Sequence, residues 1–248
     1  MEFANLYERD YMRYKNFVKE RSFLFEHDEF SNIEKIYKKL YTISELLSLL
    51  EDIDSKSMIG DFSKELKNTL VISFDLLNMN YLNSSKQIFR SAIENFFRLS
   101  LSISRYLEYR DNISKGFFKS NDSLKNLNSL FMGQSVYRLT SGTLDYFENT
   151  RIIICLTTLN TYYTELSGNV HVNNPLNFSP QKYLEDYSKY DNESIICFIS
   201  CYLNVINSIS VVLVFLLGKL DKKITKTQLQ IIELGMSSDL KIVMDNIF

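Results

Sequence analysis

Residues 195–217 read IICFISCYLNVINSISVVLVFLL, an uninterrupted segment that contains no charged side chain. At 100° per residue its few polar side chains fall on one narrow stripe, whereas Ile, Leu, Val and Phe cover the remaining surface. The stripe consists of Ser200, Asn204 and Asn207, with Cys197 and the preceding Glu193 on the same side. This pattern is typical of a buried central helix with one polar seam, which we expect other helices to cover.

The same segment is long enough to cross a lipid bilayer, because about 20 apolar residues suffice for a membrane span. Lys219, Lys222 and Lys223 follow it and would suit the cytoplasmic end of a membrane helix. The N-terminal stretch MEFANLYERDYMRYK has no apolar core of the kind that a secretory signal needs. The favoured prediction is therefore a cytoplasmic protein with a core helix at 195–217, and a membrane span is the alternative.

Composition predicts an all-α protein around this helix. Of 248 residues, 45% are hydrophobic, which is enough to bury a full core. Only 7 Gly and 2 Pro are present, too few for the many turns of a β-sandwich. The formal net charge of -2 argues against a surface that wraps duplex DNA, although it allows a local basic groove.

The three cysteines, Cys155, Cys197 and Cys201, stand in apolar runs and are interpreted as core residues. Their odd number and their spacing suggest neither a disulfide framework nor a complete zinc site, so a reducing compartment fits best. The sequence also contains no phosphate-binding glycine loop and no nucleophile elbow. We therefore expect no metal ion and no cofactor.

Apolar periodicity predicts the positions of the helices. The expected helices cover residues 1–25, 28–53, 61–80 and 83–110, then a segment through Leu156 that ends at Gly168, the segment 195–217, and a last stretch from Thr225 that breaks near Gly235. Residues 111–140 are rich in Ser, Asn, Lys and Gly and indicate a long connection, with one short helix near 124–130. The chain should thus form a multi-helix bundle.

We divide the chain into three expected segments. These are an N-terminal helical extension over 1–80, a helical core over 81–220 and a C-terminal helical segment over 221–248.

Two short motifs within the expected core carry the functional signal. One is Arg90-Ser91-Ala92-Ile93-Glu94-Asn95, and the other is Tyr163-Thr164-Glu165-Leu166-Ser167-Gly168-Asn169-Val170-His171. Together they resemble the divergent HEPN-like helical proteins of prokaryotic defence and abortive-infection systems. The resemblance covers about residues 81–220, and it implies a HEPN-like helical bundle for that part of the chain.

The resemblance also implies a function: a metal-independent endoribonuclease or toxin that acts on RNA, as a homodimer or as a subunit of a larger defence complex. Its catalytic residues would be Arg90, Glu94 and His171, at a cleft between protomers. A guanidinium can hold a phosphate oxygen, and an imidazole can move a proton at neutral pH. Glu94 would orient Arg90. The residues assigned to substrate binding are Ser167, Asn169 and Asn204.

One feature departs from the family pattern, in which His follows Arg after about four to six residues. Between Arg151 and His171 there is no Arg, so His171 would depend on an Arg of another helix. The family spacing occurs instead at Arg21 and His27, where we interpret it as a chance match.

Structural alternatives stand beside each functional assignment. Arg90 and Glu94 are four residues apart, which is also the spacing of a surface ion pair on a helix. His171, which follows the expected helix end at Gly168, could simply cap that helix. Lys219, Lys222, Lys223 and Lys226 are commonly a solvated helix end rather than an RNA contact. At the level of function, the alternatives are a catalytically inactive helical adaptor or regulatory subunit, and a membrane-anchored effector.

Overall fold

The structure, a computed structural model, describes residues 2–53, 57–116, 139–140, 143–144, 147–170, 184–235 and 237–245. Side chains are described in these ranges except at residues 2–5, 169–170, 184–185, 239 and 243–245. The described residues form helices and connections and contain no β-strand, which confirms the all-α prediction. The helices are α1 (Glu2–Glu20), α2 (Asn32–Ser48), α3 (Ile59–Asn78), α4 (Leu82–Ser114), α7 (Thr150–Val170), α8 (Asn192–Lys219), α9 (Lys226–Leu234) and α10 (Ser238–Asp245).

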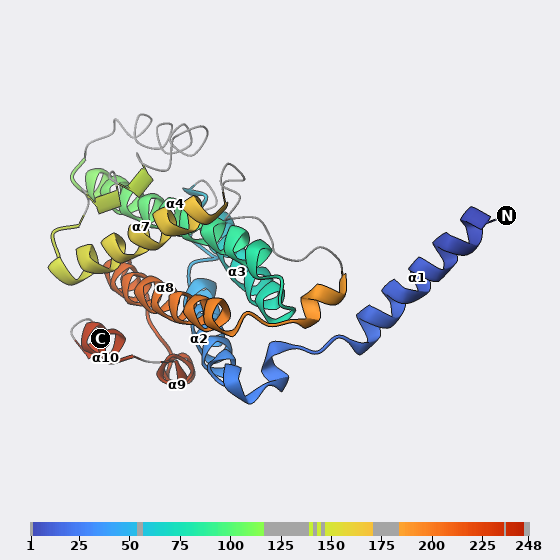
Figure 1. Cartoon of the computed structure of the whole chain (residues 1–248). Coiled ribbons are helices and arrows are strands. Elements are labelled where there is room, and N and C mark those ends of the chain that lie inside the picture. Colours follow the sequence, from blue (N-terminus) through green and yellow to red (C-terminus); the bar gives the residue numbers. More distant parts are fainter. Residues whose placement is uncertain are drawn as a thin grey trace.

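Helix α8 contains the uncharged segment and lies at the centre of the bundle, packed against α2, α4, α7 and α10 (Figure 1). It is capped at its start by Asp191, whose carboxylate accepts a hydrogen bond from the backbone N–H of Ser194 at 3.2 Å. Among the described helices, α8 is the one long and apolar enough to cross a membrane, and 67% of its most apolar stretch is buried inside the molecule. Packing on several sides is the arrangement expected of a core helix.

A single hydrophobic core joins residues from all three expected segments of the chain. It extends from Leu24 and the apolar face of α2 through α3, α4, α7 and α8 to Ile232 of α9 and Leu240 of α10. The side chains described for α1, from Leu6 onward, contribute nothing to this core, and the helix projects away from the bundle (Figure 1).

Two buried serines hold α3 and α4 together as a hairpin. Ser73 Oγ lies 3.0 Å from the carbonyl oxygen of Ser85, and Ser85 Oγ lies 2.6 Å from the carbonyl oxygen of Ser73. Each hydroxyl thus donates to the backbone of the other helix, and such small side chains let the two backbones come close. The turn between the helices uses Asn80 in the left-handed conformation with φ 61, one of the few residue types that tolerate it.

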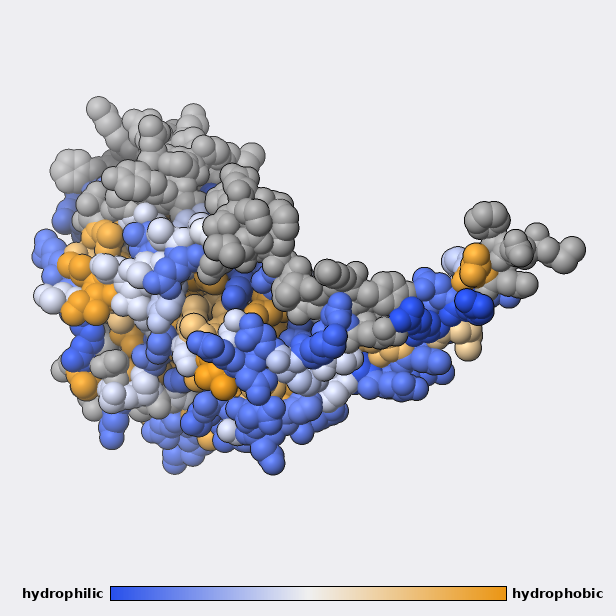
Figure 2. Space-filling model, viewed as in Figure 1, coloured by the Kyte–Doolittle hydropathy of each residue, from blue (hydrophilic) through white to orange (hydrophobic). Residues whose placement is uncertain are grey.

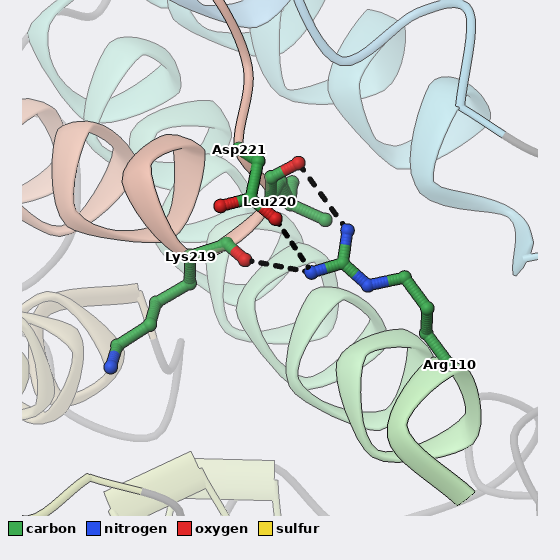
Figure 3. A network of polar contacts seen from close by, with 4 residues as sticks. All are labelled: Arg110, Lys219, Leu220 and Asp221. Carbon is green, nitrogen blue, oxygen red and sulfur yellow. Dashed lines mark hydrogen bonds and ion pairs between the residues drawn. The ribbon is translucent and has the colours of Figure 1, made fainter. Parts of the chain in front are cut away.

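The C-terminal end of α8 is tied to α4 by Arg110 (Figure 3). Its guanidinium donates to the carbonyl oxygen of Lys219 at 3.1 Å and to the carboxylate of Asp221 at 3.1 Å, with a longer contact to the carbonyl of Leu220 at 3.5 Å. A cation at this position satisfies carbonyl groups that have no partner within the helix, and it opposes the negative end of the helix dipole.

Each expected helix is present, but several ends differ from the expected ones. Helix α1 ends at Glu20 rather than near residue 25, α2 ends at Ser48 rather than 53, and α4 continues to Ser114 into the stretch expected as a connection. Helix α7 does not end at Gly168 but continues to Val170. Gly168 does not adopt the left-handed φ of a terminating glycine, so its backbone can continue the helix. The short helix expected near 124–130 lies outside the described residues.

Candidate functional site

Arg90 is the centre of the candidate site, because its side chain bridges α4 and α7. The neighbouring Phe89 and Ile93 are buried in the core, which places Arg90 at the edge of α4 beside α7. Its Nε donates to Ser167 Oγ at 2.8 Å, and its Nη2 donates to the Tyr163 hydroxyl at 2.7 Å. The centre of the guanidinium also lies 4.9 Å from the centroid of the Tyr163 ring.

Both α7 partners stand on one face of that helix, four residues apart. The hydroxyl proton of Ser167 is engaged with the carbonyl oxygen of Tyr163 at 2.7 Å, which leaves Ser167 Oγ free to accept from Arg90. The guanidinium is therefore fixed at two of its three nitrogens. Among the described residues, Nη1 of Arg90 has no hydrogen-bond partner.

Glu94 does not orient Arg90. Its carboxylate forms an ion pair with Arg98, one turn further along α4, at 2.7 Å between Oε1 and Nη2. Both side chains of this pair are largely buried, with 15% and 23% exposure. The residues that orient Arg90 are instead Tyr163 and Ser167, and Tyr163 was not among the predicted site residues.

His171 and the side chain of Asn169 lie outside the described residues. In the sequence His171 directly follows Val170, the last residue of α7.

The polar seam of α8 lies mostly at the surface and is only partly covered by other helices. Ser200 and Asn204 are exposed, and Asn207 is half-buried. Asn204 donates to the hydroxyl of Tyr162 on α7 at 2.9 Å, so it is linked to α7 but not to Arg90. The expectation that other helices cover the seam was wrong for Ser200 and Asn204, because the packed side of α8 is its broad apolar surface, whereas Asn207 is partly covered.

The interpretation of the cysteines as core residues needs correction for Cys197, whereas Cys155 and Cys201 do pack against the core. Cys197 is exposed, whereas Cys155 and Cys201 are partly buried. Burial, with a smaller contribution from Glu165, raises the pKa of Cys201 to about 12. In the described part of the chain, no group of three or more His, Cys, Asp or Glu side chains could hold a metal ion.

Lys86 is a second cation near this site and was not among the predicted site residues. It stands one turn before Arg90 on α4 and is half-buried, with its amino group 5.9 Å from the ring centroid of Phe198. Desolvation lowers the pKa of Lys86, and the nearby thiols and Asp191 oppose that effect. The i,i+4 spacing of Lys86 and Arg90 is visible in the sequence and could have indicated a cationic strip on α4.

Arg21 and His27 are engaged separately, in contacts that attach the N-terminal segment to the bundle. Arg21 Nη1 donates to the Tyr81 hydroxyl at 3.2 Å. His27 Nε2 lies 2.8 Å from Ser22 Oγ and 3.1 Å from the hydroxyl of Tyr190. These contacts favour a structural role for both residues.

A hollow of about 460 Å³ lies elsewhere, lined by α4, residues 147–149 and the C-terminal part of α8. Its nearest α4 residue, Ser104, is about 20 Å along the helix from Arg90. The hollow is therefore not part of the Arg90 site.

Comparisons with protein-family models, with curated protein sequences and with solved structures find no match for this chain.

Proposed function

We propose that the chain is an RNA-cleaving effector of the HEPN-like kind, in which Arg90 holds a phosphate oxygen and His171 moves a proton. The observation that carries the proposal is the fixed guanidinium of Arg90, with Nη1 unpaired among the described residues. A guanidinium that is oriented before the substrate arrives loses little freedom when a phosphate binds its remaining donors.

The surroundings of Arg90 support binding of an anion. Lys86 contributes a second positive charge on the same side of α4, and its half-buried position reduces screening by water. The nearest acidic side chain along that helix, Glu94, is already paired with Arg98. Asp191 acts on Lys86 and offsets part of its charge, so Arg90 is the main source of positive charge in the site.

In the proposed reaction, the 2′-oxygen of a nucleotide attacks the adjacent phosphorus, and the bond from phosphorus to the 5′-oxygen breaks. The products are a 2′,3′-cyclic phosphate and a 5′-hydroxyl end. The 2′-hydroxyl loses its proton to a base, and the leaving 5′-oxygen gains one from an acid. His171 fills one of these two roles, water or the His171 of a second copy fills the other, and Arg90 stabilises the charge on the non-bridging oxygens.

The experiment compares RNA cleavage by the wild type with cleavage by Arg90→Ala and His171→Ala, in the presence of EDTA. Both variants should lose activity by orders of magnitude while the helix content stays unchanged. Arg90→Ala should lower the thermal midpoint because it removes two hydrogen bonds between α4 and α7, so its activity is compared at a temperature at which it remains folded. Arg90→Lys keeps the charge but not the forked geometry, and it should remain strongly impaired. His27→Ala is the matched control and should cleave RNA as the wild type does.

Two other results would contradict a catalytic role for these residues. If His171→Ala unfolds the protein, the residue is a structural cap. If Arg90→Ala and His171→Ala both keep full activity, the catalytic proposal fails.

A second candidate function is a catalytically inactive adaptor or regulatory subunit. The observation that favours it is α1, which presents exposed aromatic side chains away from the bundle. In that case the bonds of Arg90 would serve only to join α4 to α7.

A further inference from the structure

Helix α1 is an arm that stands clear of the rest of the molecule (Figures 1 and 2). Its main packing contact with the body is to the short 3-10 helix Leu184–Ser188. The arm is nevertheless amphipathic, because several of its aromatic and aliphatic side chains recur on one side, although the exposed Leu6 and Met12 point elsewhere. The structure therefore holds an apolar helix face without a covering element among the described residues.

Four side chains form the centre of this face, at successive spacings of four, three and four residues. They are Tyr7, Tyr11, Tyr14 and Val18, with exposed fractions of 68%, 45%, 46% and 44%. Alternating steps of three and four are the pattern by which one helix meets another along a seam. The pattern thus indicates a helix as the partner of this face.

The charges of the arm argue against a lipid surface as the partner. The acidic residues Glu2, Glu8, Asp10 and Glu20 are matched in number by the basic residues Arg9, Arg13, Lys15 and Lys19. Helices that lie on anionic membranes carry an excess of basic residues on their polar side. This arm has no such excess.

The arrangement of charges beside the seam fits a second copy of the same helix. When two arms run antiparallel, with Tyr11 of each facing Tyr14 of the other, Tyr7 of each faces Val18 of the other. Glu8 and Lys15 then flank the seam on the same side, so that each Glu8 meets the Lys15 of the opposite arm. Neither residue forms an ion pair within the described part of its own chain.

We propose that α1 is a self-association arm, which pairs with α1 of a second copy in antiparallel orientation through Tyr7, Tyr11, Tyr14, Val18 and the pair Glu8–Lys15. A two-fold axis through the middle of the paired arms makes the contact self-complementary and closes it at two copies. The inference does not depend on RNA cleavage, and the adaptor function would be compatible with it.

The test is sedimentation velocity of the full-length protein at low salt. The wild type should sediment as a dimer at micromolar concentration, and Tyr11→Ser/Tyr14→Ser should sediment as a monomer. Tyr37→Ser/Tyr41→Ser is the matched control, because it removes two exposed tyrosines from α2, and it should remain a dimer.

A charge exchange tests the antiparallel register. Glu8→Lys and Lys15→Glu should each raise the dissociation constant of the dimer by roughly fivefold or more. Each single variant places like charges opposite one another at both of the symmetry-related contacts. The double variant Glu8→Lys/Lys15→Glu should restore the wild-type dimer. In a parallel pair Glu8 would not face Lys15, so the double variant would not rescue the single ones.

Three outcomes would overturn the proposal. The first is a wild type that is monomeric at about 100 micromolar, and the second is a dimer that persists in Tyr11→Ser/Tyr14→Ser. The third is a Glu8→Lys/Lys15→Glu dimer that is no tighter than the dimers of the two single variants. A monomer that co-sediments with vesicles of neutral and anionic phospholipid would instead identify the arm as a membrane anchor. None of these results decides whether Arg90 and His171 cleave RNA, which the cleavage assays measure separately.

Discussion

At the scale of single residues, the position of Glu94 between two arginines decides how the candidate site is built. Arg90 precedes it by one turn and Arg98 follows it by one turn, and both spacings allow an ion pair. The structure pairs Glu94 with Arg98, which is the favoured order of an acidic residue before a basic one. The side chain of Arg90 is therefore available to bind Tyr163 and Ser167 of α7. The sequence contains this preference, but it does not show which helix supplies the hydroxyl groups that then bind Arg90.

Tyr202 offers a residue-scale prediction about the core. Its ring is fully buried and stacks on Phe89 with centroids 4.0 Å apart, and its hydroxyl donates to the carbonyl oxygen of Leu70 at 2.5 Å. Tyr202→Phe removes this hydrogen bond but keeps the packing, so the free energy of unfolding should fall by about 1 kcal/mol. Urea denaturation measures the change, and Tyr41→Phe, at an exposed site, should leave stability unaltered.

Thiol labelling provides a second residue-scale prediction. Cys197 is exposed, whereas the pKa of the partly buried Cys201 is raised to about 12. The thiolate is the reactive form, and at pH 8 almost no Cys201 is ionised. Labelling with a disulfide reagent should therefore show a fast phase that disappears in Cys197→Ser and persists in Cys201→Ser. A fast phase lost in Cys201→Ser would contradict the assignment.

At the scale of elements, the helices themselves were largely predictable, because apolar periodicity depends on the chain alone. Helix α8 is the clearest case, because the uncharged run indicated most of its length. The structure adds only the residues that cap its two ends, Asp191 and Arg110. The direction in which its polar seam faces could not be predicted. A stripe such as Ser200 and Asn204 is compatible with both a buried seam and an exposed one, and the packing of neighbouring helices decides between them.

Two glycines yield a matched prediction at this scale. A Cβ on Gly235, in the turn between α9 and α10, would collide with the side chain of Thr42 on α2. Gly235→Ala should destabilise the protein by roughly 1–3 kcal/mol, because α9 must move away from α2. In contrast, Gly168 lies within α7 with open space around it, so Gly168→Ala should stabilise by up to about 1 kcal/mol. Thermal denaturation of both variants measures the difference in sign.

At the scale of the whole molecule, the distribution of α8 contacts makes a prediction about fractionation. Most of the apolar surface of α8 is already covered by α2, α4, α7 and α10. The protein should therefore remain in the supernatant after cell lysis without detergent. Recovery of the intact chain in the membrane pellet, with release only by detergent, would favour the alternative of a membrane span.

The candidate site could be predicted only in part, because it is assembled from segments that are distant in sequence. The motif around Arg90 and the motif ending at His171 were both identified from the sequence, and the structure brings Arg90 to Ser167. The contribution of Tyr163 was missed, since a tyrosine in a helix is most often interpreted as packing. His171 remains a prediction, as it lies outside the described residues.

The reciprocal bonds between Ser73 and Ser85 have a consequence for the order in which the chain folds. The two residues are close in sequence, so joining them closes a short loop at little entropic cost, well before α2 can meet α8. We expect the α3–α4 hairpin to be formed in the folding transition state. In stopped-flow experiments Ser85→Ala should slow refolding and hardly change unfolding, whereas Tyr202→Phe should mainly accelerate unfolding.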